Sequence, residues 1–204
     1  MPATHDFPAL LSTQHDIDRA CEQVAACSCI ALDTEFVRTR TYAPKLGLLQ
    51  IEVNDLQLCI DPLSNAELAT LWALLFAPER TTVLHSGKQD MEVMWYERGD
   101  VLHNLVDTQV CAALLGYPAQ IGYAGLVNEL LTITVSKEQT RTDWTRRPLT
   151  DAQLAYAAED VAHLRRLHDL LRDRLLQEGR YEWAVEDSMA LTNLALYKPD
   201  PESA

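Results

Sequence analysis

Basic residues are scarce in this sequence. The 204-residue chain has 17 lysines and arginines against 30 aspartates and glutamates, and its net charge is −13. Such a charge argues against a protein that binds polyanions over its whole surface, because nucleic-acid affinity normally begins with a positive surface. A nucleic-acid ligand would therefore require local positive charge.

Long apolar runs are also missing. No uninterrupted apolar stretch approaches the roughly 18 residues that a membrane-spanning helix requires, and the first residues, MPATHDFPAL, lack the basic-then-apolar order of a secretory signal. We therefore expect no membrane partner and a cytoplasmic location. With 48% hydrophobic residues, the chain is expected to form one globular domain with a substantial core.

Specialised cysteine and phosphate-binding motifs are absent as well. The five cysteines form no Cys-x-x-Cys pair and no zinc-ligand spacing, so we expect buried free thiols. The Ser-Gly-Lys of VLHSGKQD lacks the GxxxxGK[ST] spacing, which excludes a phosphate-binding loop of that kind.

The strands expected from the sequence lie in its first half. Apolar runs at 28–36, 46–53 and 56–60 predict three consecutive strands, and Asn54-Asp55 predicts a hairpin turn between the last two. TTVLHS predicts a fourth strand. Helices are expected at 16–26, from a cap at Ser64 or Asn65 to Pro78, at 88–99, at 105–115, at 123–131, and as one long helix at 151–177. This order predicts a mixed sheet with helices against its faces, an α/β or α+β domain.

The segment IALDTEF places two carboxylates inside an otherwise apolar strand. Side chains at i and i+2 of a strand point to the same face, so Asp33 and Glu35 project together. Two like charges in a small region raise one pKa or recruit a cation, and hard ions such as Mg²⁺ or Mn²⁺ prefer carboxylate oxygens. A solvated edge strand would explain an isolated Asp-x-Glu pair equally well.

Two further acids follow along the chain. In VLHSGKQDMEVM, Asp90 falls in the first turn of a predicted helix, where the helix dipole alone stabilises a carboxylate. In LAYAAEDVAHL, Tyr156 and Asp160 are four residues apart on a predicted helix and therefore share one face. Taken singly, each feature fits an ordinary structural role.

In combination and in this order, these features resemble the three exonuclease motifs of the DEDD superfamily, in its tyrosine-bearing subgroup. LDTEF, LGLLQI, HSGKQDMEV and SKEQTRTDWTRRPLTDAQLAYAAEDVAHL look like the corresponding segments of the ribonuclease D family. The resemblance covers residues 10–177. It implies a ribonuclease H-like mixed β-sheet flanked by α-helices, and a 3′→5′ exoribonuclease activity.

The resemblance also implies roles for the acids. Asp33, Glu35, Asp90 and Asp160 would hold two divalent ions, Mg²⁺ or Mn²⁺, with Asp33 as the bridge, and Tyr156 would orient the attacking water. Two such ions suit phosphodiester hydrolysis, because one activates water and the other stabilises the leaving oxygen. A phenol with a pKa near 10 is a poor free base, so positioning of the water is expected instead.

Substrate contacts are expected beside the acids. The stretch 137–147 has four basic and two acidic residues, and 36–45 has three basic and none acidic. Such local charge allows an acidic chain to bind the free 3′ end of a single-stranded RNA tail. Buried packing is the alternative for the aromatic residues and the histidine. The expected contacts are Phe36, His85, Lys137, Gln139, Trp144 and Arg147.

The length of the chain departs from the family pattern. Ribonuclease D continues into two helical domains after its nuclease domain, whereas this sequence ends shortly after Arg180. We expect an exonuclease domain at 1–180, a short C-terminal extension at 181–204 that is helical and then irregular, and no further helical domains. Grip on a tRNA-precursor-like or other structured RNA would then be weaker, or would come from a second copy of the chain or another protein.

Two other functions stay open at this point. A 3′→5′ exonuclease of single-stranded DNA would use the same acids, because RNA is distinguished from DNA by contacts to the 2′-hydroxyl. A non-catalytic nucleic-acid-binding module would be expected to lose one of the acids or the tyrosine, and this sequence keeps all five. A metal-independent phosphodiesterase is disfavoured because the motifs contain no paired histidines.

Overall fold

The computed structural model describes residues 8–38, 43–135 and 142–198. Its centre is a six-stranded mixed sheet with the strand order β1-β4-β3-β2-β5-β6. β2 pairs antiparallel with β3 and parallel with β5, so the strand that carries Asp33 and Glu35 lies inside the sheet. The strands are β1 (Leu10–Leu11), β2 (Cys29–Val37), β3 (Lys45–Val53), β4 (Leu56–Ile60), β5 (Thr81–Leu84) and β6 (Leu105–Asp107).

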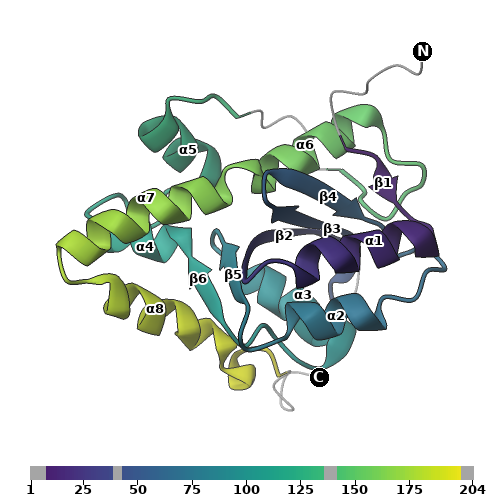
Figure 1. Cartoon of the computed structure of the whole chain (residues 1–204), viewed down its shortest axis with the longest axis horizontal. Helices are drawn as coiled ribbons and strands as arrows, with labels where there is room; N and C mark the ends of the chain where they lie inside the picture. Colours follow the sequence, from purple (N-terminus) through teal and green to yellow (C-terminus); the bar gives the residue numbers. More distant parts are fainter. Residues whose placement is uncertain (1–7, 39–42, 136–141, 199–204) are drawn as a thin grey trace.

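Helices cover both faces of the sheet (Figure 1). α1, α2 and α3 pack on one face and share the largest core cluster with β2 and β3. α6 and α7 cover the other face, while α4, α5 and α8 pack with α7 near β6. The helices are α1 (Gln14–Ala25), α2 (Ala69–Leu75), α3 (Lys88–Arg98), α4 (Thr108–Leu114), α5 (Tyr123–Leu131), α6 (Asp151–Ala162), α7 (Leu164–Gln177) and α8 (Tyr181–Met189), followed by two 3₁₀ turns, η1 (Ala190–Thr192) and η2 (Leu194–Leu196).

The expected α/β architecture is confirmed, including the hairpin. β3 and β4 pair antiparallel, and the two residues between them, Asn54 and Asp55, have φ values of 49° and 67°. Positive φ at both positions is what a tight two-residue hairpin turn requires. Within the described part of the chain, no helix is both long enough and apolar enough to cross a membrane.

The single helix predicted at 105–115 is wrong. The structure forms β6 there, pairing parallel with β5, and only then α4. The strand ends and the helix begins at Asp107, because the Asp107 side chain accepts a hydrogen bond from the backbone N–H of Gln109 and so caps α4. A short apolar run cannot by itself distinguish a buried strand from a helix.

The long helix predicted at 151–177 is also wrong, because it breaks at His163 between α6 and α7. The backbone N–H of His163 donates to the Tyr123 hydroxyl at 3.2 Å, and that hydroxyl donates to the Glu159 carbonyl at 2.7 Å. The break therefore depends on a residue from α5, far away in the sequence, and no local glycine or proline marks it.

The predicted cap of α2 is displaced. α2 begins at Ala69, without a capping side chain, instead of near Ser64 or Asn65. Ser64 donates its hydroxyl hydrogen bond to the Asp61 carbonyl, and the Asp61 side chain accepts from the Leu63 N–H. These local bonds hold the segment in turns that compete with the helix. The two-residue strand β1 was not foreseen either.

Candidate active site

Three acids from two elements come together on the α6 side of the sheet. Asp33 and Glu35 on β2, together with Asp160 on α6, each offer a carboxylate oxygen, and these oxygens lie within 4.8 Å of one another. All three side chains are partly exposed to a cleft of about 510 Å³. The i and i+2 spacing on the strand thus aims two carboxylates at a third that the helix supplies.

Asp90 lines the same cleft from the first turn of α3. Its carboxylate oxygen Oδ1 accepts hydrogen bonds from the Thr34 N–H at 3.1 Å and from the Thr34 hydroxyl at 2.5 Å. Thr34 lies between Asp33 and Glu35 on β2, and its side chain points to the opposite face of the sheet. One strand therefore presents two acids and also holds a third.

Burial and mutual repulsion raise the pKa values of these acids. Burial, followed by the charges of Asp160 and Asp90, raises the pKa of Glu35 to about 8. Burial also raises the pKa of Asp160 to about 7 and that of Asp90 to about 6, and burial with three neighbouring acids raises that of Asp33 well above its usual value. Positive charge at this cluster would relieve the repulsion.

Tyr156 stands one helical turn before Asp160 on α6 and lines the cleft. Burial and the Asp160 charge raise the pKa of its phenol. A hydrogen bond between the two side chains acts in the same direction on the phenol and lowers the pKa of the carboxyl. Tyr156 therefore stays protonated at neutral pH, with its hydroxyl beside the acids.

Trp144 lies beneath Tyr156 instead of along the cleft. Its side chain is 1% exposed, and the two ring centroids are 6.2 Å apart. The close approach depends on Gly47 of β3, because a Cβ at that position would lie 2.7 Å from the Trp144 carbonyl oxygen. The expectation that Trp144 contacts substrate is corrected in favour of the alternative, because packing against the sheet buries the side chain.

Arg147 binds a structural acid. Its guanidinium donates to both carboxylate oxygens of Asp61 and to the carbonyls of Trp144 and Gly47. These bonds fasten the segment before α6 to the sheet. The expectation that Arg147 reaches substrate is corrected as well, because its hydrogen bonds hold it away from the cleft.

Phe36 and His85 line the cleft, and their contact with substrate stays a prediction, whereas Lys137 and Gln139 lie outside the described residues. The His85 ring is engaged on both sides: Nδ1 lies 2.9 Å from the Thr108 hydroxyl and Nε2 lies 2.9 Å from the Ile121 carbonyl. Burial lowers the pKa of His85. Its ring therefore forms part of the cleft wall.

Sequence reasoning missed four residues of the cleft, namely Thr34, Arg38, Ser86 and Gln89. Arg38 was noticed only as part of a basic segment. An adjoining pocket of about 200 Å³ shares Asp33, His85, Tyr156 and Asp160 with the cleft and adds Tyr123 and Leu164. Tyr123 has no signal in the sequence because its place beside the acids depends on the packing of α5.

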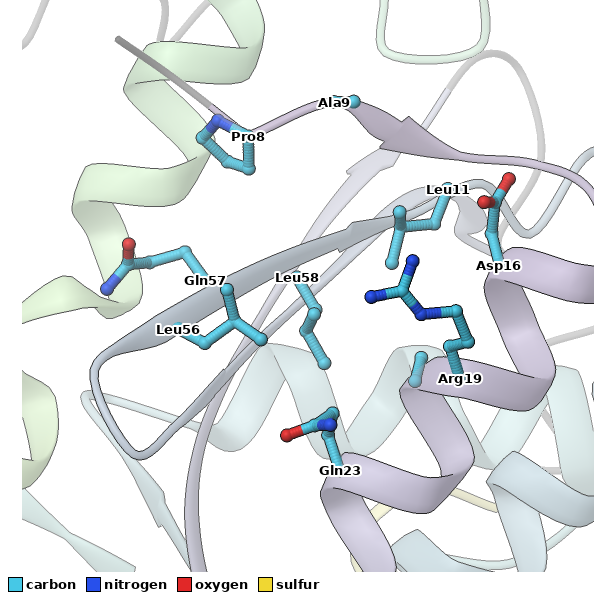
Figure 2. A pocket seen from close by; sticks show the side chains of 10 residues that line it. Pro8, Ala9, Leu11, Asp16, Arg19, Gln23, Leu56, Gln57 and Leu58 are labelled. Carbon is cyan, nitrogen blue, oxygen red and sulfur yellow. The ribbon is translucent and has the colours of Figure 1, made fainter. Parts of the chain in front are cut away.

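A different pocket, at the edge of the sheet, offers a contrast (Figure 2). It measures about 250 Å³ and lies between α1 and β4, where Leu11, Leu56 and Leu58 supply apolar walls. Its acid, Asp16, accepts hydrogen bonds from Thr13 in the capping box of α1, and this lowers its pKa. Among the residues described, the only acidic group with metal-ligand spacing is the cluster in the cleft.

Comparisons with known proteins agree with this geometry. A model of the 3′-5′ exonuclease family matches residues 8–176. Ribonuclease D of Gluconacetobacter diazotrophicus is 41% identical over 197 residues, which are 96% of this chain and 50% of that protein. The crystal structure of Escherichia coli RNase D, described as an exoribonuclease involved in structured RNA processing, matches with a TM-score of 0.88 and 37% identity, covering 94% of this chain and 51% of that one.

A third similarity concerns a protein of comparable length. Brucella melitensis NrnC with bound Mg²⁺ matches with a TM-score of 0.72 and 27% identity, covering 82% of this chain and 83% of that chain. By contrast, this chain spans about half the length of the first two ribonuclease D relatives that it matches.

Proposed function

The chain belongs to the 3′-5′ exonuclease family, and from this membership we propose that it is a metal-dependent 3′→5′ exoribonuclease. It would hydrolyse the terminal phosphodiester bond of an RNA and release 5′-monophosphates one at a time. The observation that carries the proposal is the meeting of Asp33, Glu35 and Asp160 within 4.8 Å beside Tyr156. The similarity to an exoribonuclease over nearly the whole chain supports RNA as the substrate class.

The acids fit divalent metal ions. Asp33, Glu35 and Asp160 offer oxygen ligands at short mutual distances. Burial raises their pKa values, with the neighbouring acids adding to it at Asp33 and Glu35, so bound cations would favour the ionised carboxylates. Carboxylate oxygens are the ligands that Mg²⁺ and Mn²⁺ prefer. When bound, two such ions supply water activation and charge stabilisation at the leaving 3′-oxygen. We propose Asp33 as the ligand shared by both and Asp90 as a further ligand.

Tyr156 would position the attacking water. Its phenol keeps its proton, because burial and the Asp160 charge raise its pKa, so it acts as a hydrogen-bonding group and not as a base. Trp144 beneath the ring and Asp160 beside the hydroxyl limit the directions in which the phenol can point. This orientation would hold one water in line with the scissile bond.

The substrate would be the single-stranded 3′ tail of an RNA, such as a tRNA precursor or another structured RNA. The cleft is open to solvent and about 510 Å³ in volume, a size that suits the end of a single strand. A free 3′-hydroxyl is neutral, whereas a terminal 3′-phosphate adds roughly −1.5 to −2 charges near four carboxylates. The proposal therefore requires a hydroxyl end.

The test uses RNA labelled at its 5′ end and carrying either a 3′-hydroxyl or a 3′-phosphate. We expect a one-nucleotide ladder only with the hydroxyl, and only with Mg²⁺ or Mn²⁺ present. A matched DNA strand labelled at its 5′ end and an internally labelled circular RNA complete the set. Cleavage of the circle, or equal cleavage of both ends, would contradict the proposal, and faster cleavage of DNA than of RNA would favour a DNA exonuclease.

A further inference from the structure

Arg38 lies at the rim of the acidic cleft. It follows the last residue of β2, three positions after Glu35, and its side chain lines the cleft together with the four acids. Of the cleft residues that the structure describes, it is the one arginine or lysine. A positive group at this place faces the path of any polyanion that approaches the acids.

Two elements hold the Arg38 guanidinium in place. Its carbon Cζ lies 5.6 Å from the centroid of the Phe36 ring, which comes from the end of β2. Its two terminal nitrogens donate to the two carboxylate oxygens of Glu92 on α3. The side chain is nevertheless 36% exposed. The group is thus pre-oriented and accessible, which reduces the rotamer entropy lost when it binds a ligand.

The contact with Glu92 indicates the chemistry that Arg38 recognises. A guanidinium offers two parallel N–H groups, and this fork fits a carboxylate and a phosphate in the same way. We propose that Arg38 binds a backbone phosphate of the RNA upstream of the scissile bond, and that this phosphate takes the place of the Glu92 carboxylate. The inference rests on the proposed exoribonuclease function and assigns a substrate contact to that same site.

The position of Arg38 along the strand favours an upstream phosphate over the scissile one. Three residues of β-strand span about 10 Å. The backbone of Arg38 therefore lies about that far along the chain from Glu35, away from the acids that define the scissile position. On the other side of Asp33 and Asp160, the adjoining 200 Å³ pocket is lined by Tyr123 and Leu164, and no described residue there is a lysine or arginine. That pocket fits the terminal nucleoside, and the remaining chain then leaves past Phe36 and Arg38.

The test compares Arg38→Gln with Arg172→Gln. Arg172 on α7 is a matched control because its side chain is 38% exposed and also pairs with acids, Asp169 and Asp173, but it lies outside the cleft. We expect Arg38→Gln to raise KM for a single-stranded RNA about tenfold with kcat within twofold. Since one phosphate contact on a single strand contributes about 0.7 to the slope of log affinity against log salt, that slope should become shallower by about this amount.

Single methylphosphonate substitutions locate the phosphate. In wild-type protein, neutralising the first or second linkage upstream of the scissile bond should raise KM, whereas neutralising the fifth should not. In Arg38→Gln, the penalty at that one linkage should disappear. An unchanged penalty at both linkages, or a KM equal to that of Arg172→Gln, would overturn the assignment. Failure of wild-type protein to degrade any RNA would instead overturn the proposed function.

Discussion

Two acidic sites near the sheet, Asp61 and the cluster around Asp33, have pKa values shifted in opposite directions. Asp61, just after β4, has a side chain that is only 8% exposed, and Arg147 binds both of its oxygens. Burial alone would raise the pKa of Asp61, but the hydrogen bonds from Arg147 and from the Leu63 N–H, together with the Arg147 charge, outweigh burial and lower it. The pKa of Asp33 is raised instead, because burial and the charges of three other acids act on its carboxyl group.

The opposite pKa shifts distinguish an acid with a structural role from acids arranged as in a ligand-binding site. The chain itself supplies the cation for Asp61, and the pair fastens the segment before α6 to the sheet. At Asp33, Glu35 and Asp160, the acids gather on an open cleft, and repulsion among them is retained in the folded protein. A cluster that retains repulsion is typical of a site that binds cations from solution.

The largest expected effect comes from Asp33→Asn. It changes little in volume but removes charge from the proposed shared ligand, so hydrolysis of RNA should fall to background. Because repulsion among the acids is relieved, the melting temperature without metal should stay level or rise. Activity assays and thermal unfolding in a chelator check both parts. Near-normal rates of hydrolysis in this variant would contradict the proposal that Asp33 is a metal ligand.

Tyr156→Phe should have the next largest effect. It deletes the hydroxyl proposed to hold the water and leaves the ring on Trp144, so kcat should fall by about 10²–10⁴-fold. Metal binding, measured by calorimetry, should remain close to that of the wild type. Lost metal binding with unchanged turnover would assign the residue a different role.

Asp61→Asn tests the other half of the comparison with the same chemical change. It leaves Arg147 without its carboxylate, and breaking a partly buried pair costs about 1–3 kcal/mol after allowance for solvent. At roughly 2–4 °C per kcal/mol for a chain of this size, the melting temperature should fall measurably. The kcat of the folded protein should stay within about threefold. A stability equal to that of wild type would mean that the pair contributes little.

The smallest effect is a pH dependence of stability without metal. The folded protein holds protons at Glu35 and Asp160 up to about pH 8 and pH 7, whereas the unfolded chain releases them near the ordinary values of 4.5 and 3.8. The stability that these groups contribute is therefore present at low pH and lost as pH rises from about 4 to about 8.

Thermal unfolding between pH 5 and pH 9 in a chelator should therefore show a falling melting temperature. Saturating Mg²⁺ or Mn²⁺ should flatten the curve, and Asp33→Asn should make it shallower. Asp61 has the opposite sign, because its pKa is lowered, and its contribution is lost only in acid. A melting temperature that rises over this range would contradict the raised pKa values.

The parts of the site that could be predicted are those that depend on local periodicity. The spacing of two along a strand places Asp33 with Glu35, and the spacing of four along a helix places Tyr156 with Asp160. In both cases, one element alone fixes the direction of the side chains. Asp90 was predicted only from the resemblance to the exonuclease motifs, because an acid in the first turn of a helix fits a structural role by itself.

The parts that could not be predicted depend on partners from elsewhere in the chain. Arg147 is turned away from the cleft by Asp61, and Trp144 is buried because β3 offers a glycine at the point of contact. The break between α6 and α7 requires Tyr123 from α5. A sequence carries no local sign of such pairings, so a basic or aromatic residue beside a motif is easily mistaken for a substrate contact.

Gly47 also determines which changes of length this sheet tolerates. Across from it on β2, Glu35 pairs with Leu48 and Phe36 with Leu46, so β3 carries one residue more than its partner there. Because of this extra residue, Leu46 packs in the core cluster on the α1 face and Leu48 in the cluster on the α6 face, although they are two positions apart. Deleting Gly47 would equalise the two strands and leave both side chains on these faces, because neighbouring residues of a regular strand alternate in direction. A deletion elsewhere in β3 would instead turn the rest of the strand to the opposite face.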